Sequence, residues 1–174
     1  MLGNYKTLIK NQYEAAFRTL KHCIDKCSEE SWGKPVCNHQ FSQSVFHGLF
    51  FADLYLGPNP DVISDQAFHS EHAAIFEGYE EMEHRPPVKT YEREFINLYL
   101  EHCREKAKSK VAEFTEEILQ AKSGFHWIDG SAAEVHVYNI RHIQHHAAQL
   151  SLRLRIDSKV DVPWVKSGWE EGSQ

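Results

Sequence analysis

Residues 131–156 read SAAEVHVYNIRHIQHHAAQLSLRLRI, and apolar residues recur through this segment at intervals of three and four. That period lines one side of an α-helix, so the segment predicts a long helix that ends near Ile156, about 39 Å at 1.5 Å per residue. Ser131, followed three residues later by Glu134, is a capping box. In this motif each side chain accepts a hydrogen bond from the other residue's backbone, which marks the start of the helix.

Three earlier segments have the same period. Apolar side chains recur over residues 4–28, over residues 41–56 and over about 30 residues from Tyr91 onward. Each of these segments predicts a long helix. Residues 57–66 contain two prolines and predict a loop, and a weaker pattern over residues 68–83 predicts an extra short helix.

No segment alternates apolar and polar residues between turn signals, as a half-buried β-strand would. The 174 residues therefore predict a single all-α domain over residues 1–174, a helical bundle with one extra short helix and an irregular C-terminal tail. The tail contains Trp164 and Trp169. Because two tryptophans are costly to leave in water, we expect the tail to pack back onto the bundle.

The chain has 19 lysines and arginines against 25 aspartates and glutamates, a net charge of -6. It lacks a basic field for phosphate groups, so we expect neither a nucleic-acid partner nor a membrane partner. No apolar run approaches the roughly 18 residues of a membrane span, and the first residues lack the pattern of a secretion signal. We therefore expect a cytoplasmic protein whose four cysteines are reduced thiols.

The 12 histidines are the feature most directly linked to chemistry, because imidazole is the side chain that most often ligates metals. His142 and His146 are four residues apart on the predicted last helix, so both rings project from one side and can reach one divalent cation. His47, in the apolar segment VFHGLFF, is the best third ligand, because an unpaired polar ring there would be expensive. His145, three residues after His142, is the alternative partner.

Other clusters are weaker candidates. Cys23, Cys27, Cys37 and His39 could form a zinc site, but they lack the close C-x2-C spacing of most structural zinc sites, so core or surface thiols are the better interpretation.

Two further groups suggest metal ligands: His69 with Glu71 and His72, and Glu81 with His84. A di-iron bundle needs two Glu-x-x-His motifs and two further glutamates, which the sequence does not supply.

Five residues are weak candidates for a role beside the metal. Asp53 could act as a base or orient a ligand, although a hydrogen-bonded helix-end carboxylate is the commoner role. Gln149 and Arg153 continue the stripe of His142 and His146, so Arg153 is a weak catalytic candidate and Gln149 a substrate-binding one. Tyr138 and Asn139, one turn before His142, could line a substrate pocket, with core packing as the alternative for Tyr138.

The segments RHIQHHAAQL (141–150) and SVFHGLFFAD (44–53) resemble the last-helix and second-helix motifs of the DinB/YfiT-like superfamily of metalloenzymes. The resemblance covers nearly the whole domain. It implies a four-helix bundle with up-up-down-down order and makes His47, His142 and His146 the ligands of a divalent metal. Members often have Arg-Gly between the last histidine and the glutamine, where this chain has Ala147-Ala148.

Three neutral imidazoles leave a coordination position open, and a bound cation there can turn water or a thiol into a nucleophile. Zinc or nickel is the first expectation, and iron, manganese or cobalt could bind the same ligands. The resemblance implies a homodimer and a metal-dependent enzyme, a thiol-dependent S-transferase or isomerase, acting on a small-molecule or thiol substrate. A hydrolase that uses the activated water is the other expected enzyme. The alternative is a non-catalytic metal-binding or stress-related helical protein.

Overall fold

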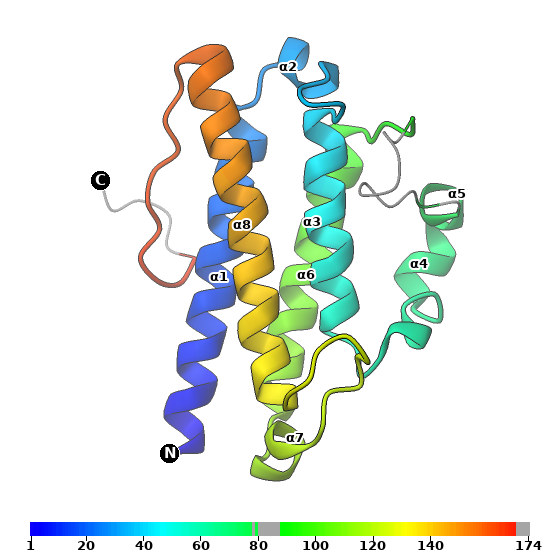
Figure 1. Cartoon of the computed structure of the whole chain (residues 1–174), viewed down its shortest axis with the longest axis vertical. Coiled ribbons are helices and arrows are strands. Elements are labelled where there is room, and N and C mark those ends of the chain that lie inside the picture. Colours follow the sequence, from blue (N-terminus) through cyan, green and yellow to red (C-terminus); the bar gives the residue numbers. More distant parts are fainter. Residues whose placement is uncertain (78, 80–87, 170–174) are drawn as a thin grey trace.

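The computed structural model describes residues 1–77, 79 and 88–169. Four long helices lie side by side in it (Figure 1). They are α1 (Leu2–Lys26), α3 (Phe41–Tyr55), α6 (Arg93–Glu113) and α8 (Ala132–Ser158). The described ranges contain two isolated β-bridges and no strand, so the prediction of an all-α chain is confirmed.

The first and last long helices run in the same direction. The Tyr5 hydroxyl donates to the Ala133 carbonyl at the start of both helices, and the Cys23 thiol donates to the Ala147 carbonyl further along. Helix α3 is antiparallel to α8, because residue numbers rise along α3 where they fall along α8. For example, the Asn139 amide donates to the carbonyl of Ala52, at the far end of α3.

Helices α3 and α6 are parallel to each other, since the Leu49 carbonyl accepts from Cys103 and the Asp53 carboxylate from Lys106. The order along the chain is therefore up-down-down-up, and the expected up-up-down-down order is wrong. The reason is that α6 begins at the same end of the bundle as α3, where the Gln43 amide near the start of α3 donates to the Lys89 carbonyl just before α6 (Figure 1).

The predicted third helix is interrupted. Helix α6 ends at Glu113, and a separate short helix, α7 (Glu116–Gln120), follows. The break occurs because Phe114 turns to an extended backbone, with its side chain 2% exposed, and Thr115 then caps α7 by accepting from the Ile118 amide. The apolar stripe continues from α6 into α7, so the sequence pattern did not predict this break.

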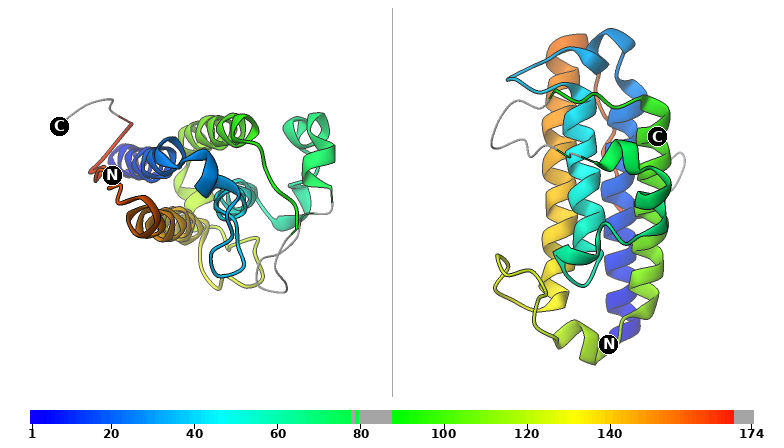
Figure 2. Two further views of the ribbon diagram at one scale, coloured as in Figure 1. Left: turned by 90° about the horizontal axis from the view of Figure 1, so that it is seen from above. Right: turned by 90° about the vertical axis from the view of Figure 1, so that its right-hand side faces the viewer.

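The predicted short helix over residues 68–83 is divided in two and does not extend past Phe76 among the described residues, and its positions 78 and 80–83 lie outside them. The connection holds a 3-10 turn, η1 (Pro60–Val62), and two short helices, α4 (Ala67–Glu71) and α5 (Ala73–Phe76). His72 leaves helical geometry between α4 and α5, with φ -117° and ψ 29°. Seen end-on, α4 and α5 lie outside the four long helices, next to α3 and α6 (Figure 2).

Side-chain caps also mark the starts of other helices. The capping box of Ser131 and Glu134 is present at the start of α8, as predicted. A short helix α2 (Glu29–Gly33) with Ser28 as its N-cap links α1 to α3, and α3 is capped by Gln40 and Gln43. No described helix has both the length and the apolar composition required to cross a membrane.

Candidate metal centre

Three histidines from two helices meet where α3 packs against α8. His47 comes from the middle of α3, and His142 and His146 come from successive turns of α8. The ring centroids are 4.7 Å apart for His47 and His146, 5.5 Å for His47 and His142, and 4.5 Å for His142 and His146. One nitrogen of each ring lies within 4.8 Å of the others, so the three could hold a metal ion.

The sequence of α3 places His47 there. The helix is apolar on nearly all sides, because it packs between α8, α6 and the α4–α5 segment. Gly48, next to His47, removes a side chain where α3 meets His146. The two helices can therefore approach closely at the level of the three imidazoles.

All three rings are neutral in this environment. Burial, followed by the neighbouring imidazoles, lowers the pKa of His47 to about 3 and that of His146 to about 2. Burial and the nearby His145 lower the pKa of His142 to about 4. A metal binds the neutral form of imidazole, so these rings can bind a cation at neutral pH without first losing a proton.

The donor geometry fits a divalent cation. The Nε2 atoms of His142 and His146 are 3.1 Å apart. Two nitrogens bound tetrahedrally at about 2.0–2.1 Å from one zinc ion would lie roughly 3.3 Å apart, so little movement is needed. Three nitrogen ligands also leave a coordination position for water or substrate, as catalytic zinc sites do.

Aromatic rings border one side of the cluster. The Phe51 ring lies 4.8 Å from that of His47 and 5.4 Å from that of His142, and the Tyr55 ring lies 6.2 Å from His142. Beside His142 the surface is hollowed by a cavity of about 540 Å³. Its lining comes from α8: Tyr138, Arg141, His142, Gln144 and His145.

The Tyr79 hydroxyl lies 3.0 Å from Nδ1 of His47. The sequence pattern did not predict this contact, because Tyr79 follows α5 and shares no helical period with His47. Phe51 was also missed, although its position four residues after His47 places both rings on one side of α3.

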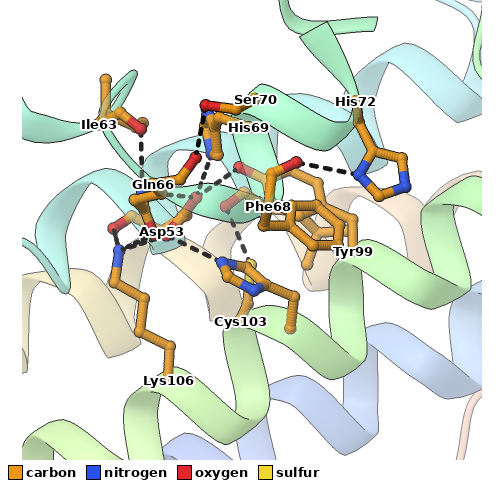
Figure 3. Close-up of polar contacts among 12 residues, drawn as sticks. Asp53, Ile63, Gln66, Phe68, His69, Ser70, His72, Tyr99, Cys103 and Lys106 are labelled. Carbon is orange, nitrogen blue, oxygen red and sulfur yellow. Dashed lines mark hydrogen bonds and ion pairs between the residues drawn. The ribbon is translucent and has the colours of Figure 1, made fainter.

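Asp53 lies in a separate buried cluster (Figure 3). Its fully buried carboxylate accepts hydrogen bonds from His69 Nε2 at 2.6 Å, the Tyr99 hydroxyl at 3.0 Å and Lys106 Nζ at 2.5 Å. Burial alone would raise the pKa of Asp53, but the neighbouring His102 and His69 imidazoles and the Lys106 ammonium hold it well below its ordinary value. These contacts occupy both carboxylate oxygens, and none of them involves His47, His142 or His146.

Arg153 binds backbone rather than the cluster. Its guanidinium donates to the carbonyls of His39, Ser31 and Lys34, so it fastens the connection between α1 and α3 to α8. Asn139 is buried and donates to the Ala52 carbonyl of α3.

The other sequence candidates sit at the edge of the site. Gln149 contacts His145, with 2.9 Å between the Nε2 atoms, and His145 is exposed outside the cluster of three. Tyr138 is 38% exposed, with its ring 5.1 Å from Tyr55, so it borders the cavity beside His142. Of the weak candidates, Tyr138 is therefore the one that lines the cavity beside His142.

The alternative metal sites do not assemble in the described part of the chain. All four cysteines are free thiols, three buried and Cys37 exposed, and none joins a group that could hold a metal. His69 binds Asp53, and His72 Nδ1 contacts the Phe68 carbonyl. The predicted pair Glu81 and His84 lies outside the described residues.

Comparison of the chain with protein-family models, with curated proteins and with solved structures found no match. The geometry of the three histidines is therefore the observation from which a function must be argued.

Proposed function

We propose that this protein is a metal-dependent enzyme of the DinB/YfiT-like type, in which His47, His142 and His146 bind one divalent cation. Zinc and nickel are the first choices. The convergence of three neutral imidazoles from α3 and α8, with His47 and His146 buried and His142 partly buried, carries the proposal. A lone buried histidine is commonly satisfied by one hydrogen bond, whereas three rings that each place a nitrogen within 4.8 Å of the others can share one metal ion.

The bound ion would supply the Lewis acidity that makes a thiol or a water nucleophilic at neutral pH. The protein's own residues exclude water and give access to the cluster. Phe51 and Tyr55 exclude water from one side of the cluster, which strengthens electrostatic interactions inside it. The cavity beside His142 gives a small electrophile or a low-molecular-weight thiol a route to the cluster, with Arg141 in its wall to attract an anionic group.

Metal analysis tests the binding step. Protein purified without a histidine tag should bind one equivalent of zinc or cobalt, and His146→Ala should lose that binding. His145→Ala is the matched control, because His145 is the adjacent residue and lies outside the cluster. Equal metal content in the wild type and in His146→Ala would overturn the assignment.

A second measurement separates an enzyme from a non-catalytic metal-binding protein. Azide or a small thiol added to the cobalt-loaded protein should change its visible spectrum, because an open coordination position accepts the added ligand. If neither probe changes the spectrum of the fully cobalt-loaded protein, the ion has no open coordination position, which would favour a structural metal site.

A further inference from the structure

We propose that Tyr79 is a positioning residue of the metal centre, held in place by a separate anchor at Asp53. Tyr79 follows α5 in the segment that we call the arm, residues 60–77 and Tyr79, which contains η1, α4 and α5. The arm lies outside the four long helices, beside α3 and α6 (Figures 1 and 2). The inference rests on the proposed function, because it concerns the orientation of a proposed ligand.

The contact between Tyr79 and His47 determines which imidazole nitrogen is left for a metal. The Tyr79 hydroxyl is 3.0 Å from Nδ1 of His47. In a neutral ring with Nε2 ligating, Nδ1 carries the proton and donates to the Tyr79 oxygen. This bond fixes the tautomer and the rotation of the ring, the role that outer partners have for metal-bound histidines.

His47 differs from the other two rings in this respect. Nδ1 of His142 and Nδ1 of His146 are buried, and neither has a hydrogen-bond partner within residues 1–77, 79 and 88–169. Their positions are set by adjacent turns of one helix, α8. His47 comes from the other helix, so the Tyr79 hydroxyl orients the ring on which closure of the three-ligand set depends.

The position of Tyr79 is itself well supported. Its ring stacks on Phe50 at 4.1 Å and 18°, and it lies 5.7 Å from the ring of Phe46. Both phenylalanines belong to α3, the helix of His47. Removal of the hydroxyl alone would leave these ring contacts in place.

The start of the arm is fastened by a buried ionic cluster (Figure 3). Asp53 of α3 is bound by His69 of α4 at 2.6 Å and by Lys106 of α6 at 2.5 Å. Gln66 joins the same pair, donating to Asp53 at 3.3 Å and accepting from Lys106 at 2.8 Å. From this anchor the chain continues through α5, where the Phe76 ring stacks on His69 at 3.7 Å. A single helix, α3, thus holds both the anchor and the histidine that the arm orients.

A comparable hydrogen bond elsewhere in the bundle provides the control. The Tyr13 hydroxyl lies 3.0 Å from Nδ1 of His136, the same atoms at the same distance. His136 does not belong to the group of three. Tyr13→Phe therefore removes an equivalent bond without touching the metal centre.

The experiment measures cobalt and zinc affinity by competition with a chelator, together with the visible spectrum of the cobalt form. Tyr79→Phe should weaken metal binding by about 10–100-fold and shift the cobalt bands. Tyr13→Phe should leave both unchanged. Metal affinity in Tyr79→Phe within twofold of the wild type, with an unchanged spectrum, would overturn the role of Tyr79.

A double-mutant cycle tests the anchor. His69→Ala should weaken metal binding in the wild type and cause no further loss in Tyr79→Phe, because its effect passes through Tyr79. Equal losses in both backgrounds would overturn the link between the anchor and the metal centre. A wild-type chain that binds no ion would instead overturn the proposed function, so the two failures are distinguishable.

Discussion

A methyl group at Gly48 of α3 would lie 3.4 Å from the Cβ of His146 on α8, an ordinary van der Waals contact, so the two helices approach closely beside the three histidines. The glycine follows His47 directly, and a side chain larger than methyl would have to displace His146 or separate the two helices that supply the ligands. The spacing of the cluster therefore depends on a small residue at position 48, which offers no ligand itself.

Gly48→Ala should keep metal binding and raise the free energy of unfolding by up to about 1 kcal/mol, because a methyl group fits and alanine favours a helix. Gly48→Leu should push His146 away and weaken metal affinity at least tenfold. Urea denaturation and cobalt titration measure the two effects. Wild-type affinity in Gly48→Leu would show that the helix spacing does not control the site.

The stability of the metal-free protein should depend on pH through its buried histidines. In the unfolded chain histidine titrates near pH 6.5, whereas the pKa of His146 in the fold is lowered to about 2. The unfolded state alone then binds a proton as the pH falls below about 6.5, so this contribution to stability is complete above that pH and is lost below it.

His146→Leu removes one such group. Between pH 6 and pH 5 the wild type should lose about 1 kcal/mol more free energy of unfolding than His146→Leu, measured by urea denaturation with a chelator present. Parallel curves for the two proteins over this interval would contradict a neutral, buried His146.

Lys106 neutralises a carboxylate that is completely buried. Lys106→Met should lower the free energy of unfolding by about 3–5 kcal/mol, because it removes the cation that neutralises the buried Asp53 carboxylate. Asp53→Leu combined with Lys106→Met should recover part of this loss. The control is Lys110→Met, since Lys110 pairs with Glu113 at the surface, where a pair contributes about 0–1 kcal/mol. Similar losses for the two lysine variants would contradict the special position of Lys106.

Local spacing was enough to predict the start of α8 and the His142–His146 pair, because both depend on residues three or four positions apart. His47 could be added because a polar ring in an apolar helix needs a partner. The direction of α6 was not predictable, since it depends on the end of the bundle at which α6 begins. The contact of Tyr79 with His47 was equally hidden, because it joins two segments with no common period.

The C-terminal tail packs back through one of its two tryptophans. Trp169 lies against the core, with the Arg104 guanidinium carbon 3.7 Å from its ring centroid, while Trp164 is 77% exposed. The expectation that the tail packs back onto the bundle is therefore confirmed, although Trp164 stays exposed. Gly168, at φ +71°, turns the chain and donates to the Asn11 carbonyl of α1, which brings Trp169 onto the bundle.

Trp169→Ala should lower the free energy of unfolding by about 1–2 kcal/mol, because it removes apolar burial and a cation–π contact together. Trp164→Ala should change it by less than about 0.5 kcal/mol, as expected of an exposed side chain. Urea denaturation followed by far-ultraviolet circular dichroism measures both variants without relying on the tryptophan signal they alter. If the two substitutions had equal effects, the contact of Trp169 with Arg104 would contribute nothing to stability, and the tail would not be part of the folded unit.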